Sequence, residues 1–213
     1  MPSIEQARIL IMATDGFEQS ELMVPLEKLR QAGATVEVAA PEEGEITGWD
    51  QNDWGESVPV DLLLEEVHPD DFDAIVLPGG QMNPDKLRMV PKAIEIIRAF
   101  HDSGKVVAAI CHAPWLLIEA GVAEGRRMTS YESIKTDVMN AGAHWSDEAV
   151  IADKGIVTSR KPDDLDAFVS KIIEEIREGE HDRGTATQGA EAGQPGRMGE
   201  GAGRTQGVMG EGV

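Results

Sequence analysis

Short apolar runs alternate along this chain with segments whose apolar residues recur at helical spacing. This alternation is typical of a parallel β-sheet whose strands are joined by crossover helices. We therefore expect an α/β fold with a mostly parallel sheet. Its strands are predicted at residues 7–13, 35–40, 73–78, 106–110, 150–152 and 156–158.

The helical segments lie between these runs. The first, residues 18–31, places Leu22, Leu26 and Leu29 on one face and is stopped by Gly33. The acidic, turn-rich segment 41–58 is interpreted as a hairpin or as an excursion outside the main sheet. Further helices are predicted at residues 84–102, 114–120 and 133–140, with a final amphipathic helix that begins near residue 161.

The chain changes character near its end. Residues 180–213 hold 10 of the 23 glycines and almost no bulky apolar side chain. Such a stretch buries too little surface to offset the entropy lost on ordering. We interpret residues 180–213 as a flexible, Gly-rich acidic tail. A length of 213 residues suits one folded domain, residues 1–179, together with that tail.

Charge limits the binding partners. The 19 Lys and Arg residues against 39 Asp and Glu residues give a net charge of −20. The tail carries three Arg and five acidic residues, so −18 belongs to residues 1–179. This surface repels phosphate backbones and anionic lipid, and no Lys/Arg cluster interrupts it. We do not expect nucleic acid or a membrane as partner, and a small neutral substrate fits better.

Two further features indicate a soluble cytoplasmic protein. The single cysteine, Cys111, cannot form an intramolecular disulfide. The N-terminus shows no basic segment followed by a long apolar one, and the longest apolar runs are far too short to span a bilayer.

Cys111 lies where an apolar strand meets a helix, with the small residues Ala109 and Ala113 two positions away on either side. A sharp strand-to-helix turn exposes the side chain at its apex, as in the nucleophile elbow of hydrolases. The start of the helix also aims N–H groups at the sulfur, which favours the thiolate. Cys111 is therefore a candidate nucleophile, although a free cysteine is also commonly a small buried apolar residue.

Two side chains near Cys111 are candidate proton carriers. His112 would act as a base if a carboxylate orients it, or it is simply a polar residue at a helix start. Glu18 follows the first strand and lies on the same edge of the sheet as Cys111. As a protonated carboxyl it would donate a hydrogen bond to the sulfur, or it only supplies favourable charge at a helix N-terminus.

Main-chain groups near Cys111 are candidates for binding a substrate oxyanion. Gly79 and Gly80 follow a strand and permit close approach, although a tight turn would explain them equally well. The main chain of Ala113 is a third candidate for binding the oxyanion. We expect no metal and no cofactor, because no phosphate-binding Gly-rich loop occurs and the remaining histidines show no ligand spacing. These histidines are His68, His101, His144 and His181.

Four ordered motifs together resemble the ThiJ/PfpI superfamily, most closely its PfpI branch of intracellular proteases and general stress proteins. They are Asp-Gly-Phe-Glu at 15–18, Leu-Pro-Gly-Gly at 77–80, Ala-Ile-Cys-His-Ala-Pro-Trp at 109–115 and Thr-Ser-Arg-Lys-Pro-Asp-Asp-Leu at 158–165. The resemblance covers roughly residues 7–177. It identifies residues 1–179 as a ThiJ/PfpI-like (class I glutamine amidotransferase-like) domain.

The resemblance implies a flavodoxin-like three-layer sandwich in which Cys111 is the nucleophile on the elbow and Glu18 is its hydrogen-bond partner. In PfpI-like proteins an acid from a neighbouring subunit orients the histidine. Asp85 is the nearest match, although a Glu is usual there. Such a site requires a homodimer or a higher homo-oligomer.

Two functions follow from this resemblance. The first is a stress-related cysteine hydrolase that acts on carbonyl electrophiles. It would be a deglycase or glyoxalase acting on methylglyoxal or early glycation adducts, or a peptidase acting on short peptides. The second is a non-catalytic redox sensor or chaperone-like stress protein that uses oxidation of Cys111. His112 favours the enzyme, because a sensor needs no base.

Overall fold

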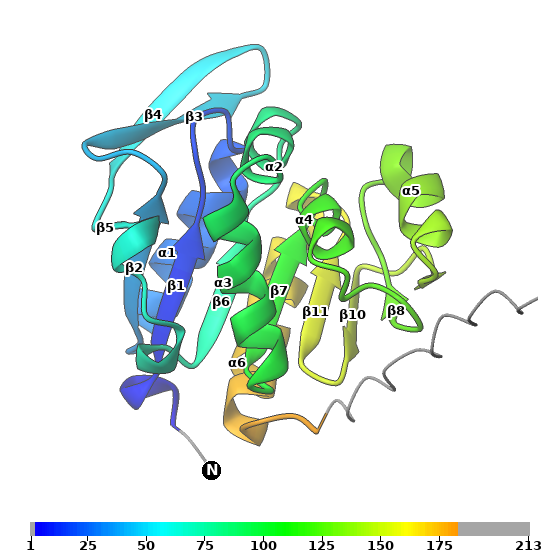
Figure 1. Cartoon of the computed structure of the whole chain (residues 1–213). Coiled ribbons are helices and arrows are strands. Elements are labelled where there is room, and N and C mark those ends of the chain that lie inside the picture. The colour runs from blue at the N-terminus through cyan, green and yellow to red at the C-terminus, as the bar shows by residue number, and fades with distance from the viewer. Residues whose placement is uncertain (1–2, 183–213) are drawn as a thin grey trace, which may run out of the picture. The chain divides into compact units, whose positions relative to one another are not determined.

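A seven-stranded sheet forms the centre of the part of the chain that our computed structural model describes, residues 3–182. Its strand order is β10-β11-β7-β6-β1-β2-β5. Every neighbouring pair is parallel except β10 and β11, which are antiparallel (Figure 1). The predicted α/β class with a mostly parallel sheet is confirmed.

The elements have the following bounds. The strands of the main sheet are β1 (Arg8–Met12), β2 (Thr35–Ala40), β5 (Leu62–Leu63), β6 (Ala74–Leu77), β7 (Val106–Ile110), β10 (Val150–Asp153) and β11 (Ile156–Ser159). The helices are α1 (Gln19–Gln31), α2 (Met82–Leu87), α3 (Pro91–Asp102), α4 (Pro114–Glu119), α5 (Lys135–Asn140) and α6 (Leu165–Glu178). Two small sheets pair β3 (Glu45–Asp50) with β4 (Asp53–Pro59) and β8 (Arg127–Met128) with β9 (His144–Trp145).

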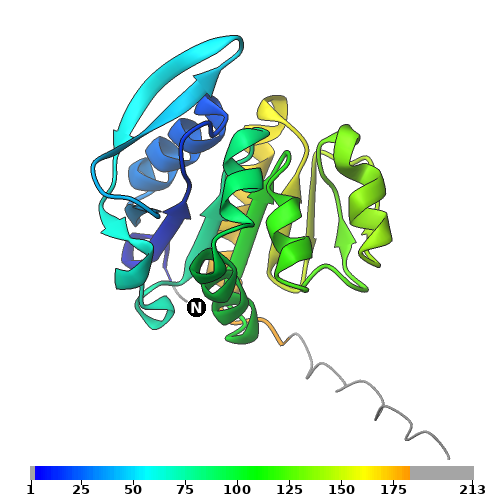
Figure 2. The same cartoon turned by 45° about the horizontal axis from the view of Figure 1, so that its top comes forward.

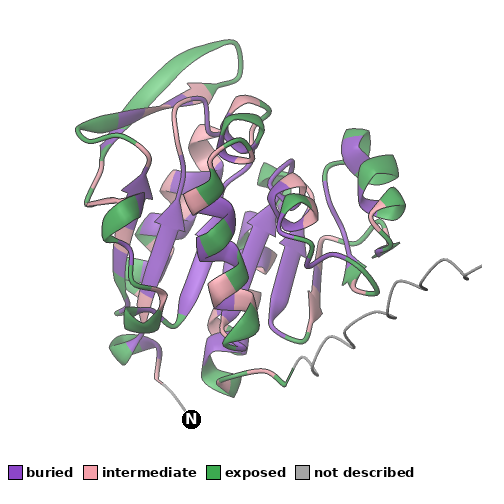
Figure 3. Ribbon diagram, viewed as in Figure 1, coloured by how far each residue is buried: buried purple, intermediate pink, exposed green. Residues whose placement is uncertain are grey.

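Helices cover both faces of the main sheet, and five of its strands, β1, β2, β6, β7 and β11, contribute buried side chains to both. In β1, Ile9 and Ile11 join the core beneath α1 and α6, whereas Leu10 and Met12 join the core beneath α3 and α4. Successive side chains of a strand point to opposite faces, so a strand covered on both sides is a continuous apolar run. Figures 2 and 3 show these layers and the buried strands between them. The predicted three-layer sandwich is confirmed.

The helix predicted at residues 84–102 is not one continuous helix. The segment 84–102 forms two helices, α2 and α3, which are separated at residues 88–90. Pro91 occupies the first turn of α3, and Val90 before it has extended backbone with φ −100° and ψ 105°. A residue before proline avoids helical backbone because the proline ring clashes with it. The break follows from Pro91.

The segment 41–58 forms a hairpin, β3 and β4, which answers the question that the sequence left open. The hairpin is tied to the loop after β1, since Trp49 N–H donates to the Phe17 carbonyl at 2.7 Å and Gly16 N–H donates to the Thr47 carbonyl at 2.9 Å. The two-residue strands β5, β8 and β9 were not predicted, because two residues are too few for a recognisable pattern.

Residues Met1–Arg183 form one compact unit. The predicted tail, residues 180–213, falls outside the described residues except for positions 180–182, and it stays a prediction, as does the boundary at residue 179. None of the helices in the described part of the chain is long and apolar enough to cross a membrane.

Phe168 provides a test of the core beneath α6, because its side chain is fully buried there. We expect Phe168→Ala to lower the free energy of unfolding by about 3–5 kcal/mol through lost apolar contacts and the resulting cavity. The exposed Glu174→Ala on the same helix should change it by less than about 1 kcal/mol. Urea unfolding measures both, and equal midpoints would contradict this packing.

Candidate active site

The candidate site lies at the carboxyl ends of the central strands. The strand order reverses between β1 and β6, and ligands of open α/β sheets bind at such reversal points. Cys111 directly follows β7, Gly79 and Gly80 follow β6, and α1 begins shortly after β1. The topology therefore places three of the four sequence motifs at one edge.

Cys111 occupies a strained turn, as the elbow prediction requires. Its φ is +64°, a left-handed conformation that costs a non-glycine residue on the order of 1–3 kcal/mol. Main-chain hydrogen bonds hold this turn on both sides. Cys111 N–H donates to the Ser159 carbonyl at 3.0 Å, and Tyr131 N–H donates to the Cys111 carbonyl at 2.9 Å. Strain that neighbouring elements maintain is typical of functional positions.

The sulfur of Cys111 lies among hydrogen-bonding groups. Its Sγ is 3.2 Å from His112 Nδ1, and the main-chain N–H groups of Gly80 and His112 donate to it. Only 6% of the residue is exposed, so the expectation of an exposed side chain at the apex of the turn is wrong. The two N–H groups point where negative charge develops when a thiol ionises or adds to a carbonyl, which is the arrangement of an oxyanion-binding site.

Glu21, not Glu18, makes the carboxyl contact that was predicted for this sulfur. The Glu21 side chain is completely buried and hydrogen bonded with Cys111, and its Oε2 accepts the Gly79 N–H at 2.9 Å. Glu18 is the N-cap residue of α1, with extended backbone, and its carboxylate accepts a hydrogen bond from Ser20 Oγ at 3.4 Å. Glu21 lies one turn further along, on the face of α1 that meets the sheet.

Burial changes the proton equilibria of this site. Desolvation, with a further contribution from the Glu18 charge, raises the pKa of Glu21 to about 8, so Glu21 is mostly protonated at neutral pH. Burial and the ionised form of Glu21 raise the pKa of Cys111, and the N–H groups of Gly80 and His112 oppose this rise. A protonated Glu21 removes the repulsion and can donate to the sulfur.

Glu18 affects the site through its charge and not through a contact with the Cys111 sulfur. Desolvation, together with the neighbouring Asp50, raises the pKa of its half-buried carboxyl group. Its charge in turn favours the protonated form of Glu21. Glu18 therefore influences the protonation of Glu21, and its hydrogen bond is with Ser20 rather than with the sulfur.

His112 bridges two side chains. Its Nδ1 faces the Cys111 sulfur, and its Nε2 is 3.1 Å from Ser133 Oγ. The ring stacks on Tyr131 at 4.9 Å and meets the edge of Trp115 at 5.3 Å. Burial lowers the pKa of His112, so the ring is neutral at pH 7 and has a lone pair that can accept a proton. Sequence reasoning missed Ser133 and Tyr131, because nothing in their local pattern links them to Cys111.

The three predicted main-chain donors differ in what they contact. Gly80 N–H donates to the Cys111 sulfur, whereas Gly79 N–H is engaged by Glu21 and Ala113 N–H by the Ile110 carbonyl at 2.9 Å. Gly80 also has φ +79°, and a Cβ there would come within 2.7 Å of Glu18 N. Among the three, Gly80 is thus the donor available at the sulfur.

Asp85 lies on α2 with its side chain exposed, and within the described chain it makes no recorded contact with His112. It was predicted to act from a neighbouring subunit, so a single chain leaves this prediction open.

A cavity of about 500 Å³ lies near His112, but neither His112 nor Cys111 is part of its wall. Ser133 and Tyr131, which both contact His112, form part of its wall. Arg160 also lines it, held by Asp164 at 2.9 and 3.0 Å and by Asp147 at 2.7 Å. Its size suits a small molecule.

Fold and site together define an α/β protein with a cysteine on a strand-to-helix elbow at the carboxyl edge of its sheet. Residues 7–175 match the DJ-1/PfpI family, and the chain belongs to that family. It is 46% identical to a protein from Pyrococcus abyssi named deglycase, over 80% of this chain and 99% of that protein. It is 44% identical to Deglycase PfpI from Pyrococcus furiosus, with the same coverage.

Solved structures of this family have the same fold as this chain. A two-domain protein from Anabaena variabilis, with DJ-1/ThiJ/PfpI-like and ferritin-like domains, matches 81% of this chain at a TM-score of 0.77 and 34% identity. The match spans 48% of that longer chain. The flavodoxin-like fold that the motifs implied is thereby confirmed.

The raised pKa of Glu21 predicts a pH dependence of stability. The unfolded state ionises this carboxyl group near its ordinary pKa of 4.5, and the folded state does so only near 8. The stabilising contribution is therefore complete below pH 4.5 and is lost as the pH rises through 8. Between pH 4.5 and pH 8 we expect the free energy of unfolding of the wild type to fall by several kcal/mol relative to that of Glu21→Gln. Urea unfolding of both proteins across this pH range measures the difference. Identical pH profiles would show that Glu21 is ionised in the folded protein.

Proposed function

We propose that this protein is a stress-related cysteine hydrolase that acts on small carbonyl electrophiles, as a deglycase or glyoxalase on methylglyoxal or early glycation adducts. The observation that carries the proposal is the Cys111 sulfur, which faces a neutral imidazole at 3.2 Å and two main-chain N–H donors. A nucleophile, a base and an oxyanion site are the parts that addition to a carbonyl needs. The deglycase names of the two archaeal relatives support the same chemistry.

The first chemical step follows from these contacts. His112 Nδ1 accepts the proton of the Cys111 thiol as the sulfur adds to the carbonyl carbon. The new C–S bond forms, and the electron pair of the C=O bond moves to the oxygen, which the N–H groups of Gly80 and His112 stabilise. Return of the proton gives a hemithioacetal. With a dicarbonyl such as methylglyoxal, a base then moves a proton from the carbon that bears the sulfur to the neighbouring carbonyl carbon, which gives the thioester of a hydroxy acid. Hydrolysis of this thioester by water releases the hydroxy acid and regenerates the thiol.

Burial favours a small substrate over a peptide. Only 6% of Cys111 and 4% of His112 is exposed. The cavity lined by Tyr131 and Ser133, which contact His112, holds about 500 Å³. A slim aldehyde or a glycated amino-acid side chain reaches such a sulfur more readily than an extended backbone does. The charge of −18 on residues 1–179 likewise favours a neutral compound. Short peptides are the second substrate class.

A homo-oligomer is part of the proposal. Asp85 of a neighbouring subunit would orient His112, whose Nε2 meets only the Ser133 hydroxyl among the described residues. The cytoplasm is the proposed location, since a reducing compartment would keep Cys111 as the free thiol that the proposed reaction uses.

Oxidation of Cys111 is a second candidate function. The N–H groups of Gly80 and His112 would hold the oxygens of a sulfinic acid as well as they hold an oxyanion. Mass spectrometry after mild peroxide should then show oxygen added at Cys111 and no turnover of carbonyl compounds. An unmodified Cys111 would eliminate this function.

Substitution at the site tests the enzyme. We expect Cys111→Ser to reduce methylglyoxal consumption and release of an amino acid from its methylglyoxal adduct to background. His112→Ala should reduce the rate by about 10²-fold or more through loss of the base. Glu95→Gln, an exposed change on α3, is the control. A Cys111→Ser variant as active as wild type would refute the proposal.

Mixing two variants tests the shared site. Asp85→Asn should be slow if Asp85 orients His112, and Cys111→Ser should be inactive. When the two are refolded together, a mixed dimer contains one site with both native residues, so activity should return. Full activity of Asp85→Asn alone would exclude Asp85 from the site.

A further inference from the structure

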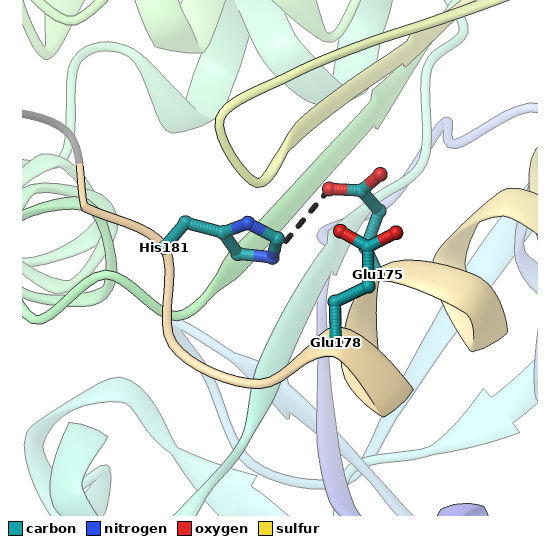
Figure 4. Close-up of side chains that lie close together, drawn as sticks. All are labelled: Glu175, Glu178 and His181. Atoms are coloured by element: carbon teal, nitrogen blue, oxygen red, sulfur yellow. Dashed lines mark ion pairs between the residues drawn. The ribbon is translucent and has the colours of Figure 1, made fainter. Parts of the chain in front are cut away.

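Three potential metal ligands gather at the end of the sheet opposite to Cys111. Glu175 and Glu178 lie in the last turn of α6, and His181 follows the helix (Figure 4). The His181 N–H donates to the carbonyl of Gly104 at 2.8 Å, and Gly104 lies just before β7. Cys111 follows the other end of that strand. The group is therefore separate from the candidate active site.

A chain reversal brings these side chains together. Glu175 and Glu178 are three residues apart and share one face of the helix. Gly179 ends the helix with φ +92°, and the chain then passes Gly104, where a Cβ would come within 2.7 Å of the His181 carbonyl oxygen. His181 is thus held over the end of α6. The sequence spacing did not indicate this group, because Gly179 ends the helix between Glu178 and His181 and the position of His181 depends on the turn that follows.

Burial distinguishes the group from a cluster of surface acids. The side chains of Glu175 and His181 are only 9% and 11% exposed. Within residues 3–182, the buried Nε2 of His181 has no hydrogen-bond partner. Its one ion pair in this part of the chain is a long one, with Glu175 Oε2 at 3.5 Å, beyond the ordinary hydrogen-bond distance of about 2.7–3.2 Å. A buried imidazole nitrogen without a hydrogen bond requires a partner.

We propose that Glu175, Glu178 and His181 bind one divalent transition-metal ion, with Zn²⁺ as the best match. Zinc lies about 2.0–2.2 Å from nitrogen and carboxylate oxygen, so two ligand atoms of a tetrahedral site are roughly 3.4 Å apart. The separation of 3.5 Å between His181 Nε2 and Glu175 Oε2 fits this geometry, and one ligand atom from each residue lies within 4.8 Å of the others. Mg²⁺ and Ca²⁺ prefer all-oxygen sites.

The ion would connect parts of the fold that are distant in sequence. It would neutralise two carboxylates and fix His181, whose main chain is bonded to the turn between α3 and β7. The end of α6 would then be joined to the amino end of the central strand. An ion that binds only the folded protein stabilises it.

Metal titration of the full chain tests this site. The experiment uses Cys111→Ser protein, so that the reactive thiol does not bind metal, after chelator treatment and dialysis. We expect calorimetry with ZnCl₂ to show one Zn²⁺ per chain and the Tm to rise on binding. Glu178→Gln should weaken the affinity at least about tenfold, as loss of even an outer-shell partner can. Because Glu178 is exposed, this variant should still fold.

Glu180→Gln is the matched control. Glu180 is exposed and lies between Glu178 and His181, so its substitution removes the same charge without removing a ligand. His181→Gln should behave like Glu178→Gln, and Co²⁺ should give a visible absorption band that both ligand variants lose. The proposal is overturned if Zn²⁺ does not bind, or if the ligand variants bind it as tightly as Glu180→Gln.

Discussion

The buried carboxyl group of Glu21 connects the elements on which the site depends. It accepts the N–H of Gly79 after β6 and is hydrogen bonded with Cys111 after β7, while its own main chain belongs to α1. There is no room for a side chain between these groups, since a Cβ on Gly79 would lie 2.6 Å from Glu21 Oε2 and 2.7 Å from Cys111 Cβ. One carboxyl group thus fixes the relative positions of a helix and two strand ends.

The rest of the fold holds this arrangement in place. A left-handed cysteine and a fully buried acid each cost free energy. The sheet offsets these costs because its central strands are buried on both faces and paired with neighbours on both sides. The sulfur is consequently held within reach of His112 and two N–H donors without rearrangement of the chain. Preorganisation of this kind is what stabilises charge in a transition state.

Sequence patterns predicted the layers well and the side-chain contacts less well. The run Val106–Ile110 followed by Cys111 predicts a buried strand and an elbow, because apolar continuity and strand direction are local properties. The carboxyl partner was assigned to Glu18, and the structure gives the contact to Glu21. Both residues are at the start of one helix, three positions apart, and the choice between them depends on where α1 begins.

Other features depend on distant segments. Ser133 reaches His112 because Tyr131 is hydrogen bonded to the Cys111 carbonyl, a contact between residues twenty positions apart. His181 reaches Glu175 only because Gly179 reverses the chain. Local periodicity contains no information about either contact. The break at Pro91, in contrast, was accessible from sequence, because proline restricts the residue before it.

The pKa of Cys111 in a Glu21→Leu variant tests the central claim most directly. Cys111 is the only cysteine of the chain, so the thiolate absorbance near 240 nm reports on it alone. Glu21 ionises near pH 8, below the raised pKa of Cys111, so its charge opposes formation of the thiolate. Its loss should therefore lower the pKa of Cys111, whereas Glu18→Gln should leave it nearly unchanged. A pKa of Cys111 that stays the same or rises in Glu21→Leu would contradict the account.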